Sequence, residues 1–498
     1  MSAQDPVLKT MRDVPKGGLS KLLRMAFDGY FGILVVGSGV RVFGLVSQFI
    51  VLIMMGRMLA KSEFGDLMTA FGFYRLVAIA IGTGASLVVL YHVARRPQDR
   101  TLEVRLHRYS TLLAAIVSTA IALAGVFGAH AIADMLGKPG LAVWFQQLAP
   151  FGVFSGLLII STGALEGRSR ITHSILLGEL APNVVRIVLL PLVTLTGLPE
   201  IYIAHVLTIS VLLPWLYSAT RLCDRSIAGV RAWDHWDYSY AGKFVIATLF
   251  ANQLAAVDIL VAGVLFSSET VGDYAIAARI ATLFSFFQIA MLKRFAPRAG
   301  KLIEGGDMAG LRSEVEVCRR LTIGCGALTI SGGLMLAPFL LPLFGNYAGA
   351  LVFLTWLAIP TFVQSFYATS DRLLIIAGHA NVALILTASS FCVLTTTPFV
   401  TAHWLGPVSI PAAMIVSALL FNSIVAVRTR QFFGIRTIEP LDRALMACGT
   451  LALAVSALNP SPFFIASACA VLGLIGLYLI GSAMRQPRGA PSVEPLAH

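Results

Sequence analysis

The 498-residue chain is 57% hydrophobic and only 12% charged, with a formal net charge of +12 at pH 7. Because an ordinary soluble domain contains about 25% charged residues, this composition excludes a water-soluble enzyme, a disordered scaffold and a nucleic-acid-binding domain. It predicts an all-α integral membrane protein. An outer-membrane barrel is excluded because several apolar runs exceed 20 residues, whereas barrel strands need about 10 alternating residues.

Fourteen apolar runs are long enough to cross about 30 Å of hydrocarbon as helices. In chain order they cover about 31–56, 66–92, 109–136, 142–164, 171–197, 200–220, 244–267, 271–292, 321–344, 349–370, 380–401, 404–427, 441–458 and 461–483.

The distribution of basic residues predicts the orientation of these spans. With a cytoplasmic N-terminus, 30 of the 37 lysines and arginines fall in inside segments, and only Arg57, Lys61 and Lys138 fall in outside loops. Since cytoplasmic loops retain basic residues, we expect both termini to be cytoplasmic. No outside loop exceeds about a dozen residues, so the chain lacks the external region that a membrane glycan polymerase or ligase usually uses to hold its acceptor.

Two landmarks recur in the two halves of the chain. Phe64-Gly65-Asp66 opens the second span, and Val271-Gly272-Asp273 opens the eighth span 207 residues later. Gly167 ends the fourth span and Gly378 ends the tenth, 211 residues later. Although glycine is common at helix ends, the two nearly equal offsets favour a parallel pseudo-repeat of two six-helix lobes followed by two C-terminal helices.

This repeat predicts the domain organisation. The expected segments are a basic cytoplasmic segment 1–30, an N-lobe 31–222, a cytoplasmic linker 223–239, a C-lobe 240–430, helices thirteen and fourteen in 441–483, and a cytoplasmic tail 484–498.

Several stretches in this order carry a resemblance to a known family. They are Arg57-Met58-Leu59-Ala60 with Glu63-Phe64-Gly65-Asp66, Asp258-Ile259-Leu260-Val261-Ala262-Gly263 with Val271-Gly272-Asp273-Tyr274 and Ala277-Ala278-Arg279, Gly306-Asp307 with Arg319-Arg320, and Leu343-Phe344-Gly345 with Tyr347. Over about residues 30–430 the chain resembles the polysaccharide flippase branch of the multidrug/oligosaccharidyl-lipid/polysaccharide exporter superfamily.

The resemblance implies a two-lobed fold whose central cavity opens alternately to each side. It also implies transport of a polyprenyl-diphosphate-linked oligosaccharide across the bacterial inner membrane, for exopolysaccharide, capsule or O-antigen synthesis. The expected partners are this lipid-linked cargo, the bilayer, and as candidates the glycosyltransferases and polymerase of the same pathway. We expect no cofactor, no metal and no nucleic-acid partner.

Charged side chains inside the predicted spans are the candidate site residues, because each costs about 2.5–3.5 kcal/mol at mid-bilayer. Arg41, Arg75 and Arg279 lie in the first, second and eighth spans. If they face the cleft, their guanidinium groups form a cationic site for the diphosphate. The related lipid II flippases are similar in placing arginines on these three helices. The alternative for each arginine is an internal ion pair, which for Arg279 would involve Asp258.

Two acidic residues within spans leave alternatives open. Glu179 and Arg186 lie seven residues apart on one face of the fifth span. They either form a structural pair bridged by water or by Asn183, or Arg186 joins the cavity. Asp258 is either structural or a titrating group that couples transport to protons or sodium.

Three other functions also stay open at this point. A cation-coupled multidrug exporter of the same superfamily would favour acids and aromatic residues over arginines in its cleft. A lipid II flippase shares the diphosphate chemistry. A membrane glycan polymerase or ligase is opposed by the short outside loops, and the chain has no P-loop, His-Glu-x-x-His or Gly-x-Ser-x-Gly motif. The sequence therefore favours a transporter over an enzyme.

Overall fold

The computed structural model describes residues 30–95, 99–168, 170–222, 257–376, 380–435 and 438–485. This part of the chain is helical and contains no strand. Ten of its helices are long and apolar enough to cross a membrane, and Phe43–Met58 is a shorter apolar helical segment. The chain is therefore an all-α, multi-pass membrane protein. The count of fourteen spans stays a prediction, because residues 223–256, which hold the predicted linker and most of span 244–267, lie outside the described residues.

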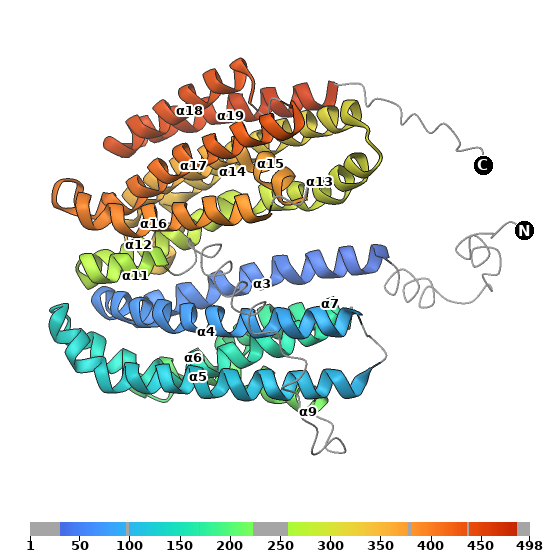
Figure 1. Ribbon diagram of the computed structural model, residues 1–498. Coiled ribbons are helices and arrows are strands. Elements are labelled where there is room, and N and C mark those ends of the chain that lie inside the picture. Colours follow the sequence, from blue (N-terminus) through green and yellow to red (C-terminus); the bar gives the residue numbers. More distant parts are fainter. Residues whose placement is uncertain are drawn as a thin grey trace, which may run out of the picture.

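The first half of the chain forms one group of helices, here called the N-bundle (Figure 1). Its elements are α3 (Tyr30–Met58), α4 (Lys61–Arg95), α5 (Arg100–Met135), α6 (Pro139–Gly167), α7 (Ile171–Ile175), the π-helical turn η1 (Leu176–Leu180), α8 (Ala181–Leu195) and α9 (Tyr202–Leu222).

Helix α6 is central to the N-bundle, since it packs against α4, α5 and α9. Small residues allow α4 and α6 to approach closely. A Cβ atom at Gly82 would lie 2.7 Å from the carbonyl oxygen of Gly156. In an apolar solvent such close packing is a main source of helix association. The buried Tyr74 adds a polar link, because its hydroxyl donates to the carbonyl oxygen of Phe145 over 2.7 Å.

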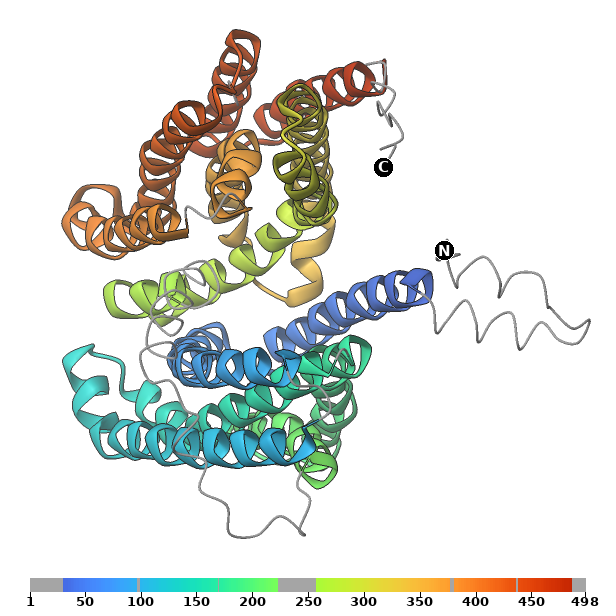
Figure 2. The same ribbon diagram turned by 45° about the vertical axis from the view of Figure 1, so that its right-hand side comes forward.

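The second half forms the C-bundle, which lies beside the N-bundle in both views (Figures 1 and 2). Its elements are α11 (Asp258–Leu265), α12 (Ser268–Ala281), the 3-10 turn η4 (Thr282–Ser285), α13 (Phe286–Glu304), α14 (Met308–Phe344), α15 (Ala350–Ile376), α16 (Ala380–Leu405), the 3-10 turn η5 (Gly406–Val408), α17 (Ser409–Phe433), α18 (Pro440–Leu458) and α19 (Pro462–Arg485). The last two helices pack on α15 and α14, respectively.

Two predicted spans are interrupted in the structure. The span predicted over 171–197 is divided by η1, which ends two residues before Pro182. Because proline has no N–H, Pro182 cannot donate to the carbonyl of Gly178, so one regular α-helical hydrogen bond is missing at this turn. The span predicted over 271–292 is divided by η4. Irregular turns of these kinds inside long helices often mark hinges or functional sites.

Candidate functional site

Three of the four arginines predicted to bind substrate meet in one cleft between the bundles. Arg75 on α4 and Arg186 on α8 come from the N-bundle, and Arg279 on α12 comes from the C-bundle. Gln48 on α3 and Thr282 on η4 line the same space, together with apolar side chains. We call this site the arginine cleft. All three arginines are half-buried.

A larger cavity of about 390 Å³ continues from the arginine cleft into the N-bundle. The two spaces share Gln48, Phe71, Arg75 and Arg186 as lining residues. The additional lining residues of this N-bundle cavity include several polar side chains: Ser155, Thr162, Glu179 and Asn183. Arg75 and Arg186 therefore stand where the arginine cleft meets a larger cavity that has both polar and apolar lining residues.

Hydrogen bonds orient Arg186 within the cleft. Its Nε donates to the Ser210 hydroxyl over 2.9 Å, and its Nη1 donates to Oδ1 of Asn183 over 3.3 Å. The amide of Asn183 in turn donates to the carbonyl oxygens of Glu179, over 2.9 Å, and Gly44, over 3.4 Å. Asn183 thus links the Arg186 guanidinium to the backbone of Glu179, whose exposed side chain lines the N-bundle cavity.

Asp258 is the buried carboxylate whose charge acts on two of the cleft arginines. It is 2% exposed, and its Oδ2 accepts a hydrogen bond from the Tyr274 hydroxyl over 2.9 Å. Its Oδ1 has no hydrogen-bond partner among the described residues. The negative charge of Asp258 acts on both Arg279 and Arg75, but no direct ion pair joins it to either one in the described part of the chain.

The charges of the cleft are unbalanced. Arg75 is repelled by Arg279 and Arg186 and attracted by Asp258. The buried carboxylate of Asp258 attracts Arg75 and Arg279, whereas Arg186 is repelled by Arg279. Positive charges that face one another in an apolar setting favour an anionic ligand between them. Arg41 lies on α3, and its side chain is outside the described residues.

The two Gly-Asp landmarks of the sequence lie against each other where α4 and α12 begin. The ammonium of Lys61 forms an ion pair with Asp273 at 2.7 Å, and the Ser268 hydroxyl donates to Asp66. Each motif therefore contributes an aspartate to a partner at the start of the opposite helix. We call these interactions the α4–α12 contact.

Glycine is needed in the α4–α12 contact because the two backbones touch. A Cβ atom at Gly65 would overlap the carbonyl oxygen of Ser268, and one at Gly272 would lie 2.8 Å from the carbonyl oxygen of Lys61. The contact is thus reciprocal in its glycines as well as in its aspartates. This arrangement holds the N-bundle and the C-bundle together at one end of the cleft.

Two basic side chains near this end extend the contact. Lys138 is 8% exposed and donates to the carbonyl oxygen of Gly263 over 2.6 Å. Burial lowers the pKa of the Lys138 ammonium, and the negative charge of Asp66 opposes that change. Arg57 donates through Nε to the carbonyl oxygen of Leu343 over 2.7 Å.

Sequence reasoning had missed several of these residues. Gln48, Ser210 and Thr282 are ordinary polar residues of apolar helices, and no spacing rule singles them out. Tyr274 stood within a stretch used for the resemblance, without a role. The described residues contain no group of three or more His, Cys, Asp or Glu side chains that could hold a metal ion.

The fold defined by these helices is that of the transporters of the MOP superfamily. The structure of the lipid II flippase MurJ in an inward closed conformation matches with a TM-score of 0.69 at 14% identity, covering 91% of this chain and 98% of that one. An inward-facing multidrug resistance MATE family transporter matches with a TM-score of 0.67 at 13% identity, covering 78% and 94%. A MOP superfamily transporter from Pyrococcus furiosus matches with a TM-score of 0.57 at 14% identity, covering 80% and 93%.

Residues 34–297 match the model of the family described as polysaccharide biosynthesis protein. The chain belongs to this polysaccharide biosynthesis protein family, as its sequence had suggested. A search of curated protein sequences gave no match.

Proposed function

We propose that the protein flips a polyprenyl-diphosphate-linked oligosaccharide across the bacterial inner membrane by alternating access. The cargo would serve exopolysaccharide, capsule or O-antigen synthesis. The observation that carries this proposal is the convergence of Arg75, Arg186 and Arg279 on one cleft between the bundles. Membership of the polysaccharide biosynthesis family supports a glycan as the cargo.

In the proposed complex the three guanidinium groups hold the diphosphate. Guanidinium forks bind phosphate oxygens in pairs, and each charged hydrogen bond contributes about 1.5–3 kcal/mol. Arg186 is already oriented by Ser210 and Asn183, so little conformational entropy is lost when it binds. We propose that Arg41 joins the site, because helical spacing places position 41 on the face of α3 that carries Gly44, Leu45 and Gln48.

The rest of the cargo would occupy the surroundings of the arginine cleft. The N-bundle cavity next to the arginines is suited to sugar hydroxyl groups, since its lining includes the polar side chains of Ser155, Thr162, Glu179 and Asn183. The polyprenyl chain would stay in the bilayer. In this scheme the enzymes that build and polymerise the glycan are the partners on the two sides of the membrane.

Alternating access would require the two bundles to rock as lobes 31–222 and 240–430. The α4–α12 contact closes one end of the cleft in this conformation, and opening that end would separate Lys61 from Asp273 and Asp66 from Ser268. We propose that this end faces the periplasm, with both termini in the cytoplasm. The breaks at η1 and η4 interrupt spans that carry cleft residues, and irregular turns of this kind often serve as hinges.

The charge of the cleft separates this proposal from drug export. A cationic drug would be repelled by the three arginines, of which only Arg75 and Arg279 are attracted by Asp258, whereas a diphosphate would be attracted. Lipid II flipping is the second candidate function, because lipid II carries the same diphosphate and the likeness to the MurJ structure covers 91% of this chain.

A deletion strain tests the proposal. Polyprenyl-linked oligosaccharides would be extracted, identified by mass and assigned to a leaflet. We expect complete repeat units to accumulate on the inner leaflet while secreted glycan is lost. An intact copy of the gene should remove the accumulation and restore the secreted glycan. Accumulation of lipid II instead would select the second candidate. Normal glycan without accumulation, in a strain that has no second flippase, would contradict both functions.

A further inference from the structure

A separate cavity lies where α14 and α18 begin and α17 ends. Its volume is about 560 Å³, and its lining includes Arg312, Glu316, Arg319, Arg430 and Glu439. It shares no lining residue with the arginine cleft or the N-bundle cavity. We call it the α14–α18 cavity. Neither the family match nor the proposed transport mechanism gives it a role.

The helix lengths place this cavity at the level of the lipid head groups. Helix α14 has 37 residues and is about 55 Å long, whereas the hydrocarbon layer is about 30 Å thick. Its first turns, which carry Arg312 and Arg319, therefore project beyond the hydrocarbon. The apolar span of α18 starts at Pro440, and α17 ends at Phe433, so the cavity adjoins the ends of two spans.

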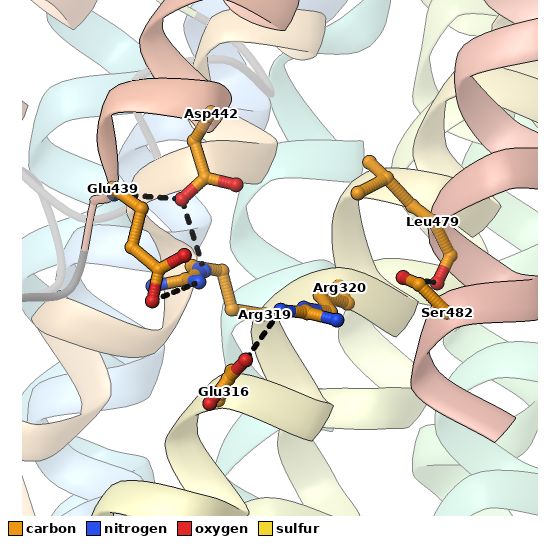
Figure 3. Close-up of polar contacts among 7 residues, drawn as sticks. All are labelled: Glu316, Arg319, Arg320, Glu439, Asp442, Leu479 and Ser482. Carbon is orange, nitrogen blue, oxygen red and sulfur yellow. Dashed lines mark hydrogen bonds and ion pairs between the residues drawn. The ribbon is translucent and has the colours of Figure 1, made fainter. Parts of the chain in front are cut away.

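The acidic side chains of the cavity already have basic partners (Figure 3). The buried Arg319, which is 1% exposed, forms ion pairs with Glu439 at 3.4 Å and with Asp442 at 3.3 Å. Arg320 pairs with Glu316 at 2.5 Å. These ion pairs connect the buried Arg319 of α14 to Asp442 in the first turn of α18 and to Glu439 directly before it, so they join the start of α18 to α14.

Two other arginines of the cavity are differently placed. Arg312 from α14 and Arg430 from α17 are both exposed, and their side chains form no hydrogen bond or ion pair among the described residues. Two guanidinium groups from separate helices thus line one cavity whose carboxylates are engaged elsewhere. Basic pockets between helices at the membrane surface are suited to anionic head groups.

We propose that the α14–α18 cavity binds the phosphate of an anionic phospholipid from the adjoining leaflet. Arg312 and Arg430 supply the donors, and the Arg319 cluster forms the fixed wall behind them. The bound lipid bridges α14 and α17 next to the start of α18. This site is independent of the cargo and would exist in the protein whatever the arginine cleft transports.

The test uses the full-length protein purified into zwitterionic phosphatidylcholine nanodiscs. Phosphatidylglycerol is titrated, and its binding is measured by native mass spectrometry after release. The double variant Arg312→Gln/Arg430→Gln is compared with wild type. Since each arginine near an anionic surface contributes about a fivefold gain in affinity, we expect binding to weaken roughly thirtyfold in the double variant.

Arg428→Gln is the matched control, because Arg428 is exposed on the same helix, two residues before Arg430, and does not line the cavity. It should bind phosphatidylglycerol like wild type. All three proteins should unfold at the same temperature without phosphatidylglycerol, since the altered side chains are exposed. The single variant Arg430→Gln removes only one of the two charges, and its affinity for phosphatidylglycerol should fall about fivefold.

Two results would overturn the proposal. One is equal phosphatidylglycerol binding by wild type and the double variant. The other is full displacement of the lipid by soluble glycerol phosphate at equal concentration, which would assign the cavity to a soluble anion. Either result would leave the proposed flippase activity unaffected, because that activity is tested by the leaflet location of the glycan.

Discussion

The arginine cleft and the α4–α12 contact both lie between the N-bundle and the C-bundle, but they differ in whether their charged side chains have direct partners. At the contact, Lys61 pairs with Asp273 and Asp66 accepts a hydrogen bond from Ser268. In the cleft, Arg75 and Arg279 have no direct ion pair within the described residues and share the influence of Asp258. Polar groups that satisfy each other hold a structure together, whereas charges left without partners favour a ligand.

Removing the unpaired charges of the cleft should have the largest effect. In Arg75→Gln/Arg279→Gln, the loss of two charge-assisted interactions of about 1.5–3 kcal/mol each should weaken diphosphate-lipid binding more than a hundredfold. The unfolding temperature should stay equal or rise, because like charges are removed. Binding of a polyprenyl diphosphate to the purified protein measures this change.

Arg428→Gln is the control for that double variant, because Arg428 lies outside the cleft. Arg279→Lys should show an intermediate loss, since lysine keeps the charge without the planar fork. Wild-type affinity in the double variant would assign the arginines a structural role.

Filling the α4–α12 contact should shift the protein toward an open conformation. In Gly65→Ala the new Cβ would overlap the Ser268 carbonyl, and such overpacking costs about 1–3 kcal/mol in the closed state. Spin labels at the exposed Met135 and Trp404, at the ends of α5 and α16, would report the distance between the N-bundle and the C-bundle. The six native cysteines would first be replaced.

We expect a longer distance between the labels in Gly65→Ala. Gly332→Ala is the matched control, because a Cβ there meets nothing within 4 Å. An unchanged distance distribution in Gly65→Ala would mean that this contact does not hold the end closed.

Neutralising Asp258 should increase the net positive charge of the arginine cleft and leave the α4–α12 contact unchanged. In Asp258→Asn the amide oxygen still accepts the Tyr274 hydrogen bond, but the attraction for Arg75 and Arg279 is lost. Because the cleft becomes more positive, we expect diphosphate-lipid affinity to rise about fivefold, or roughly 1 kcal/mol at an effective dielectric constant of 20. Titration of the lipid measures this, and weaker binding would contradict the predicted charge balance.

Breaking the Lys61–Asp273 ion pair should have the smallest effect on the population of the closed conformation. The two side chains are 29% and 10% exposed, and pairs of this kind usually contribute about 0.2–1 kcal/mol. A double-mutant cycle with Lys61→Ala and Asp273→Ala, read from the population of the short spin-label distance, measures the coupling. Additive effects of the two substitutions would show that the glycine contacts, rather than the ion pair, hold this end.

The class of the fold could be predicted from the sequence because apolar length alone identifies membrane helices. The predicted spans overlap the described helices in the same order, and three of the charged residues within them, Arg75, Arg186 and Arg279, line one cleft. Their depth along each helix follows from position. Their convergence could not be derived, because a helix that is apolar on all sides gives no periodic signal of which face meets the cleft.

The contact between the two Gly-Asp motifs was also beyond sequence reasoning. The recurrence of Gly65 as Gly272 suggested a repeat, but a repeat does not tell whether its equivalent segments touch. The π-helical turn η1 was missed for a different reason: the type of turn depends on how α8 packs against α3 and α9. Ser210 became part of the site only through that packing.

We propose that this protein moves a diphosphate-linked glycan lipid between leaflets through the arginine cleft. The most direct test of this proposal places the purified protein in liposomes with a fluorescent polyprenyl-diphosphate oligosaccharide, with proton and sodium gradients imposed in separate samples. We expect wild type to expose inner-leaflet cargo to an added quencher, whereas Arg75→Gln/Arg279→Gln should not. No protein-dependent exposure under either gradient, or equal exposure by the double variant, would contradict it.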